Sequence, residues 1–255
     1  MIRVIANGDD FGRTAGINRA ITESFKRRIL TGTTLMVNMP YADEAVSLAR
    51  EYGFEEAVGL HLNLTSGTPL TDEIKKYSRF CGKNGNFNAE FEQHTISRLC
   101  ISKGESEALR KEIEAQIQKY YSYGLPARHL DSHHHVHTDR SVMNMLMPLL
   151  KKYNFRSVRL SRNLFRKINP AKKVYKEIFN RRLKREIRVT SDYFGSYDDL
   201  KAMSAYLKPD CLVELMLHPM YDEKGRLTDS MNLPIEEVEG LLDSLKAERQ
   251  AYYLV

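Results

Sequence analysis

The chain has 255 residues, of which 42% are hydrophobic and 28% are charged. This balance is typical of a soluble globular protein and excludes a disordered, collagen-like or disulfide-rich chain. The formal net charge is +6, so a nucleic-acid-binding function has to be considered.

The sequence has no run of about 20 apolar residues, so we expect no membrane span. The N-terminal stretch MIRVIANGDDFG meets two acids after a few apolar residues, which is not the pattern of a signal peptide. Three cysteines, Cys81, Cys100 and Cys211, form no CxxC pair. This argues against a disulfide framework or a zinc knuckle and favours a reducing, cytoplasmic location.

Short β-rich runs alternate with helical patterns along the chain. In chain order the pattern predicts a strand at 2–7, a helix at 17–29, a strand at 33–38, a helix at 42–52, a strand at 58–64, a helix at 105–121, a strand at 127–133, a helix at 141–152, a strand at 155–161, a strand at 187–194, a helix at 198–207, a strand at 211–217, a helix at 235–246 and a strand at 251–255. This alternation predicts a mainly parallel sheet covered by helices. We therefore expect one α/β domain over residues 1–255, built as an irregular β/α (TIM-like) barrel of seven or eight mainly parallel strands. A doubly wound open sheet is the alternative, but no GxGxxG motif or P-loop follows any predicted strand.

Two segments interrupt the alternation. Residues 66–103 contain scattered Gly, Pro and Asn, and we expect a long insertion of the kind that shapes a binding site. Residues 162–188 hold 11 Lys or Arg and two Glu, a local charge of +9 against +6 for the whole chain, so the other residues sum to −3. An exposed helical excursion is the favoured interpretation; a site for an anionic ligand, such as a phosphorylated or acidic sugar, and a nucleic-acid-binding arm are the alternatives.

Polar residues collect at the carboxyl ends of the predicted strands. They are Asp9 and Asp10 after the first strand, His61 near the end of the third, Asp131 and His133 at the end of the fourth, and His218 after residues 211–217. Because active sites of β/α barrels lie at this rim, we expect the active site here.

The run DSHHHVH (131–137) is the densest cluster of potential metal ligands. In an extended chain, Asp131, His133, His135 and His137 would share one face, about 6.6 Å apart. That spacing allows one ligand from this strand, supported by its neighbours. Imidazoles and carboxylates are good ligands for a divalent metal, whereas any single His could instead be a hydrogen-bonded core residue.

Asp9 and Asp10 are consecutive, so their side chains point in different directions. One carboxylate can bind a metal ion while the other serves as a base, since a nearby metal charge keeps the base ionised. A helix cap or turn is the alternative role for this pair.

Four segments, taken together, resemble the YdjC carbohydrate deacetylases, a family that includes the chitooligosaccharide deacetylase ChbG. They are NGDDFG (7–12), GLHLNLTSGTPL (59–70), HLDSHHHVH (129–137) and LHPMY (217–221). They occur in family order across residues 1–221, and HLDSHHHVH is the most specific of them.

The resemblance implies a metal-dependent hydrolase that removes the N-acetyl group from an N-acetylglucosamine-type sugar or chitooligosaccharide, phosphorylated or not, and releases acetate. It implies one divalent metal ion, magnesium or zinc, held by Asp10, His61 and His133. It implies Asp9 as the general base and His218 as the general acid. Residues that would support the ligands or contact substrate are Asp131, His135 and Arg159, although a structural ion pair is the favoured role for Arg159.

Other functions stay open. A different metal-dependent barrel enzyme, such as a phosphoesterase or a sugar isomerase, could use the same Asp/His rim. A nucleic-acid-binding protein using residues 162–188 is less favoured, since no recognised binding motif accompanies the charge. We expect a small amino-sugar substrate, no nucleic-acid partner, no membrane and a homodimer.

Overall fold

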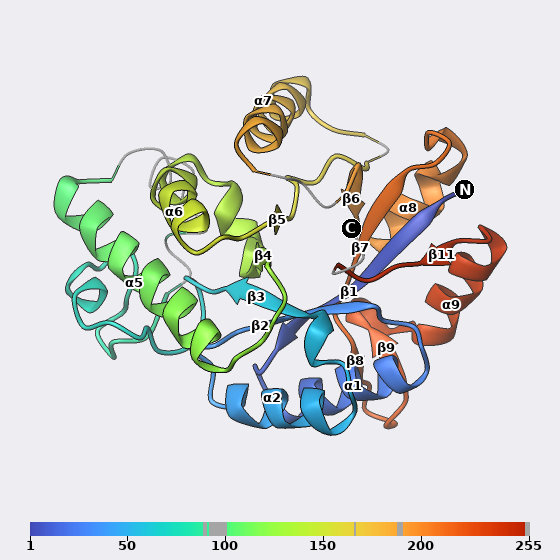
Figure 1. Cartoon of the computed structure of the whole chain (residues 1–255), viewed down its shortest axis with the longest axis horizontal. Coiled ribbons are helices and arrows are strands. Elements are labelled where there is room, and N and C mark those ends of the chain that lie inside the picture. The colour runs from blue at the N-terminus through green and yellow to red at the C-terminus, as the bar shows by residue number, and fades with distance from the viewer. Residues whose placement is uncertain (89–90, 92–100, 166, 188–190, 253–255) are drawn as a thin grey trace.

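Parallel strands form the centre of the molecule, and helices cover the outside (Figure 1). The computed structural model describes residues 1–88, 91, 101–165, 167–187 and 191–252. The main strands are β1 (Arg3–Phe11), β2 (Gly32–Leu35), β3 (Val58–Leu62), β4 (His129–Ser132), β5 (Ser157–Val158), β6 (Tyr193–Gly195) and β7 (Leu212–Leu217). Within the described residues these strands lie in the order β5-β4-β3-β2-β1-β7-β6, and every neighbouring pair is parallel.

Most strand residues are buried because both faces of the sheet are covered. All residues of β1 from Val4 onward are buried, as are all residues of β3. A short strand, β11 (Glu248–Arg249), pairs in parallel with the first residues of β1. Because the main strands are all parallel, their carboxyl ends meet at one rim. This rim carries the polar residues named above.

The sheet curls toward closure. The backbone amides of Asn163 and Leu164, which follow the edge strand β5, donate to the Phe194 carbonyl of the opposite edge strand β6 at 3.3 and 3.1 Å. These bonds link the two edges, so the sheet is an irregular TIM-like barrel rather than an open doubly wound sheet. The predicted fold class is confirmed.

Several of the described helices begin after a residue whose side chain caps the first turn. The helices are α1 (Ala15–Lys26), α2 (Ala42–Glu51), α5 (Lys103–Ser122), α6 (Arg140–Lys152), α7 (Pro170–Glu186), α8 (Tyr197–Met203) and α9 (Ile235–Ser244). Ser102 accepts from the Glu105 amide and Glu105 accepts from the Ser102 amide, a capping box that starts α5. Asn169 caps α7, with Pro170 at the first helical position. No described helix combines the length and apolarity needed to cross a bilayer.

Several predicted strands are shorter than expected. The strand predicted at 127–133 ends at Ser132, and the strand predicted at 187–194 begins only at Tyr193, with residues 188–190 outside the described part. The strand predicted at 251–255 is wrong at Ala251 and Tyr252, and residues 253–255 lie outside the described part. The Tyr252 ring instead enters the barrel and stacks on His129 with 3.7 Å between ring centroids, so the pairing segment is the earlier β11.

Both predicted insertions carry local structure. In 66–103 the described part contains a 3₁₀ turn, Ile74–Lys76, and a bridge between Cys81 and Phe87, while 89–90 and 92–100 lie outside the described residues. The basic segment forms α7, which buries Phe179 and Leu183 and exposes most of its cations, as expected for an exposed helical excursion. A small antiparallel sheet of β8 (Met220–Tyr221), β9 (Leu227–Asp229) and β10 (Leu233–Pro234) follows β7.

Candidate metal and catalytic site

The strand ends bring the predicted site residues to one pocket of about 380 Å³. Its lining includes Asp9 and Asp10 from β1, His61 from β3, His133 from the turn after β4, and His218 from the end of β7. The five side chains come from four separate segments of the sequence. The structure therefore groups the residues that the sequence predicted as ligands, base and acid.

A bulge in β1 directs both acids to this pocket. The register between β1 and β2 shifts between Gly8 and Phe11, and Asp10 has a left-handed backbone conformation with φ 69°. Bulges next to active sites re-aim side chains in this way, and Asp tolerates the left-handed region better than most residues. The bulge separates the environments of the two neighbouring carboxylates.

Asp10, His61 and His133 lie close enough to share an ion. Asp10 Oδ1 is 3.3 Å from His61 Nε2 and 3.7 Å from His133 Nε2. This oxygen is buried and accepts no hydrogen bond from any described residue. A buried carboxylate oxygen without a hydrogen-bond donor, facing two imidazole nitrogens, is a donor set that suits a divalent first-row metal. The residues present therefore fit the expected metal ion.

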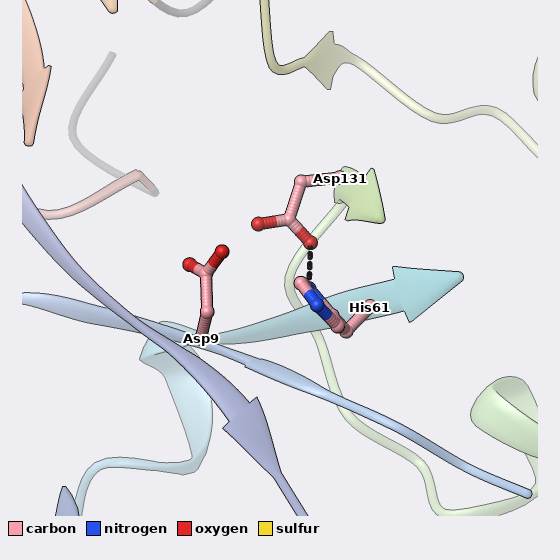
Figure 2. A group of neighbouring side chains, drawn as sticks. All are labelled: Asp9, His61 and Asp131. Atoms are coloured by element: carbon pink, nitrogen blue, oxygen red, sulfur yellow. Dashed lines mark hydrogen bonds and ion pairs between the residues drawn. The ribbon is translucent and has the colours of Figure 1, made fainter. Parts of the chain in front are cut away.

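Asp9, His61 and Asp131 form another cluster whose ligand atoms all lie within 4.8 Å of one another (Figure 2). Both of its carboxylates already bind the Arg159 guanidinium, at 2.7 and 2.8 Å. A cation at this second position would face a full positive charge. Asp10 also binds an arginine, Arg13, but through Oδ2 alone at 2.8 Å, so its Oδ1 stays open. We therefore place the candidate ion on the other side of His61, at Asp10 Oδ1.

The second nitrogen of each imidazole is held by a neighbour. His61 Nδ1 lies 2.6 Å from Asp131 Oδ1, the contact drawn in Figure 2, and 3.0 Å from Thr34 Oγ1. His133 Nδ1 lies 2.7 Å from Thr65 Oγ1. These contacts orient both Nε2 atoms toward Asp10, as supporting residues do around protein-bound metals.

The two imidazoles differ in their protonation. Burial alone would lower the pKa of His61, but the charge of Asp131 and the close approach of the Asp10 carboxylate raise it to about 10. Burial lowers the pKa of His133 to about 3, against the charge of Asp10. His133 is thus in the neutral form that can ligate a metal, whereas the acids around His61 favour its protonated form.

Asp9 is held as an ionised carboxylate. Arg159 Nη1 and Nη2 donate to its two oxygens at 2.7 and 2.8 Å, and Asn7 Nδ2 donates at 2.7 Å. Burial would raise the pKa of Asp9, but the charge of Arg159 and its hydrogen bonds hold it well below the usual range. Asp9 is therefore ionised at neutral pH, the form in which a carboxylate can act as a base.

His218 lines the pocket on the β7 side and is half-buried. It also lines an adjoining pocket of about 240 Å³ whose apolar wall contains Ile17, Pro219 and Met220. The His218 amide donates to the Asp229 carboxylate, which fixes the backbone there. The imidazole is thus placed beside Asp9 and Asp10 with access to both pockets.

The remaining predicted residues take different positions. Asp131 is buried behind His61, and Arg159 is fully buried, so Arg159 is an ion-pair partner without access to substrate. His135 lines the pocket and packs edge-on against Phe194 with ring centroids 5.4 Å apart.

The predicted shared face of Asp131, His133, His135 and His137 is wrong. The chain leaves the extended conformation at His133, and His134 and His135 have φ 50° and 55°. This left-handed turn sends His137 back into the core, where it contacts the Ser132 hydroxyl and the Arg159 carbonyl.

Sequence reasoning missed several residues that hold the site. They are Asn7, Arg13, Thr34, Thr65 and Glu214. Glu214 had a signal, because it is the charged residue inside an apolar strand, LVELML. The two threonines had none, since Thr is a common residue in strands.

The fold and the site define an α/β-barrel protein with an Asp/His cluster at the carboxyl ends of its strands. A family model described as "YdjC-like protein" matches residues 3–253, so the chain belongs to the YdjC-like family. The chain is 32% identical over 250 residues to a carbohydrate deacetylase of Clostridium beijerinckii, covering 94% of this chain and 91% of that protein. It is 37% identical over 160 residues to a carbohydrate deacetylase of Geobacillus stearothermophilus, covering 62% and 60%.

Solved structures agree on the fold. An Enterococcus faecalis protein, whose description names cellobiose-phosphate cleavage, superimposes with a TM-score of 0.74 at 23% identity, covering 99% of this chain and 98% of that one. A lactam utilization protein of Thermus thermophilus gives a TM-score of 0.52 at 14% identity, covering 98% and 99%. At these identities the similarity concerns the fold alone.

Proposed function

We propose that this protein is a metal-dependent carbohydrate N-deacetylase that hydrolyses the N-acetyl group of an N-acetylglucosamine-type sugar or chitooligosaccharide and releases acetate. The observation that carries the proposal is the buried Asp10 oxygen without a hydrogen-bond donor, which faces His61 Nε2 and His133 Nε2 beside the ionised Asp9. The curated relatives described as carbohydrate deacetylases support the substrate class.

Asp10, His61 and His133 would hold one divalent ion. Such an ion, when bound, supplies a Lewis acid that polarises the acetyl carbonyl and makes water a better nucleophile. Two imidazoles favour zinc over magnesium, because magnesium prefers oxygen ligands.

Two residues beside the ion site carry out the two proton transfers of the reaction. Asp9 accepts the proton of the attacking water, and Arg159 keeps its carboxylate ionised and correctly oriented. His218 protonates the departing amine, since an amide anion is too basic to leave. The products are acetate and a free amino sugar. The oxygen of the water molecule ends in the acetate, and a proton ends on the amine.

The geometry also weighs against a two-metal phosphoesterase. Such enzymes use two ions about 4 Å apart. Two other clusters of candidate ligands occur in the described residues, Asp9–His61–Asp131 and His129–Asp131–Glu214, and both contain acids that pair with the Arg159 guanidinium. A second ion there would meet a positive charge. The cytoplasmic location and the homodimer stay predictions.

The test is acetate release from a panel of N-acetylated mono- and oligosaccharides, before chelation, after chelation and after adding back single metals. Asp9→Asn should lower the rate by about 10²–10⁴-fold while metal affinity is retained, because only the base is lost. His133→Ala should lose metal affinity and activity together. Asp72→Asn, an exposed acid, is the matched control. Wild-type turnover in both site variants, or activity that ignores chelation, would overturn the proposal.

A further inference from the structure

A buried carboxylate lies beneath the site without lining its pocket. Glu214 is in the middle of β7, is fully buried, and is absent from the pocket lining. Its Oε2 atom accepts no hydrogen bond from any described residue. A buried charge with one unsatisfied oxygen costs stability, and the ion pair with the buried Arg159 offsets this cost. The role of Glu214 therefore has to be sought in what it does to Arg159.

The contacts of Glu214 lead to the Asp9 carboxylate through one guanidinium. Arg159 Nε donates to Glu214 Oε1, and the Tyr252 hydroxyl donates to the same oxygen at 3.2 Å. On its other edge, Arg159 donates from Nη1 and Nη2 to the two oxygens of Asp9 at 2.7 and 2.8 Å. Because a guanidinium is a rigid planar fork, fixing the Nε edge fixes the direction of the Nη edge.

Neighbouring groups restrict the same guanidinium. The Phe194 ring covers one of its faces at 4.7 Å from Cζ, and Asp131 Oδ2 lies 2.8 Å from Nη2. Asp131 and Asp9 both compete for the Nη edge, whereas Glu214 alone of these acids pairs with Nε. Glu214 therefore sets the orientation of the Arg159 guanidinium relative to Asp9 and Asp131.

We propose that Glu214 is a positioning residue for the Asp9 carboxylate: it holds the Nε edge of Arg159 so that both Nη atoms face Asp9. The inference rests on the proposed function, in which Asp9 is the base. Only an acceptor oxygen at this place is required. Burial raises the pKa of Glu214 to about 7 against the opposing charge of Arg159, so a neutral acceptor is a fair substitute.

The experiment compares three substitutions of Glu214 in the full-length, metal-loaded protein. Glu214→Gln keeps an acceptor oxygen at the same distance, Glu214→Asp withdraws it by one methylene, and Glu214→Leu removes it at similar volume. Glu112→Gln is the control, because Glu112 is an equally buried acid that binds the Leu70 and Thr71 amides away from the site. Each variant is measured for kcat, KM, metal affinity and the Nε–H NMR resonance of Arg159, assigned with Arg159→Lys.

Glu214→Gln should retain the Arg159 resonance and keep at least about a third of kcat, as should Glu112→Gln. Glu214→Asp and Glu214→Leu should broaden or shift that resonance and lower kcat by about 10²-fold. A displacement of the Asp9 carboxylate by about 1 Å is enough to lower the rate by this factor. KM and metal affinity should stay within about threefold, because the ligands are untouched.

Three outcomes would overturn the positioning role: a Glu214→Asp or Glu214→Leu variant with near wild-type kcat, a Glu214→Gln variant as impaired as Glu214→Asp, or losses of kcat and metal affinity that run in parallel. If Glu214→Leu does not fold, Glu214→Asp decides. The NMR resonance of Arg159 also separates the two proposals. A wild-type protein that releases no acetate refutes the deacetylase function, whereas an unchanged resonance in Glu214→Asp refutes the positioning role.

Discussion

The adjacent acids Asp9 and Asp10 have different surroundings, which suit them to the different roles proposed for them. Asp9 binds two nitrogens of Arg159 and the Asn7 amide, whereas Asp10 keeps one oxygen without a hydrogen-bond donor toward His61 and His133. Burial would raise the pKa of each acid, and opposite charges hold both below their usual range. Arg159 keeps Asp9 in the ionised form that a base needs, whereas the open Oδ1 of Asp10 is suited to a cation.

Glu214 should make stability depend on pH in a specific direction. Its pKa is raised from 4.5 to about 7 by burial. A carboxyl group with a raised folded-state pKa contributes stability that is present below the unfolded pKa and is lost as the pH rises through the folded pKa. Relative to wild type, the free energy of unfolding of Glu214→Gln should therefore increase from about pH 4.5 to about pH 7, by at most ~1.4 kcal/mol per pH unit, and then level off.

Urea unfolding of both proteins in a chelating buffer, at intervals across this pH range, measures the difference. The other titrating groups are common to both proteins and cancel. A difference that stays constant with pH, or falls as the pH rises, would contradict the raised pKa.

Single site residues were predictable where a polar side chain follows an apolar run, which is uncommon in buried strands. Asp10, His61 and His133 stand out as polar residues at the ends of apolar runs, and the structure brings them together. Thr34 and Thr65 orient the two imidazoles, yet a threonine in or after a strand carries no sign of a hydrogen bond to a distant residue. Their roles depend on contacts between strands, which one sequence does not display.

At the scale of elements, the turn that follows β4 decides how the histidine cluster is used. His133 faces Asp10, while the left-handed residues His134 and His135 reverse the chain and return His137 to the core. Only one imidazole of the cluster therefore joins the candidate ion site. The spacing of an extended strand predicts one ligand from this segment but not the turn, because a positive φ at His is a local exception to the extended pattern.

Substitutions of His134 test whether the turn is strained. His134 is exposed but has φ 50°, a conformation that Asn tolerates and a β-branched residue does not. His134→Val should therefore lower the free energy of unfolding by about 1–2 kcal/mol, whereas His134→Asn should change it by less than about 0.5 kcal/mol. Chemical denaturation of both variants measures this, and equal stability of the two would show that the turn is not strained.

The boundaries of two helices were predicted closely, whereas those of one edge strand were not. The predicted helices at 42–52 and 141–152 differ from α2 and α6 by one residue, because an apolar stripe over several turns defines a helix well. In contrast, β5 spans only Ser157–Val158 within the predicted 155–161. Strand length depends on which neighbours pair, and pairing is a tertiary property.

At the scale of the whole molecule, the barrel was predictable from the alternation of strands and helices, but its closure was not. The open-sheet alternative fits the same alternation. The choice is made by the Asn163 and Leu164 amides, which reach the Phe194 carbonyl across the barrel. Such long-range backbone bonds come from irregular chain that carries no periodic signal.

The charge of the molecule is concentrated on α7, which lies beyond the edge strand β5 (Figure 1). Lys173 and Arg181 both lie at 4.0 Å from Glu177, a distance at which exposed ion pairs contribute little. Lys172 and Arg185 are exposed as well. The outer face of α7 is thus a solvated, positively charged surface, held to the barrel by Phe179 and Leu183 on its inner face.

Replacing Lys172, Lys173, Arg181 and Arg185 by Gln should leave the free energy of unfolding within about 0.5 kcal/mol, because exposed positions contribute little to stability. Acetate release from neutral sugars should be unchanged, since these residues do not line the catalytic pocket. Retention on a polyanion column should weaken, and the salt dependence of that retention should become shallower as four charges are removed. Acetate assays, urea unfolding and salt-gradient elution check the three expectations.

A rise in KM confined to phosphorylated sugars would instead assign α7 to an anionic ligand. Tight binding of the wild-type protein to RNA or DNA at physiological salt would support the nucleic-acid interpretation.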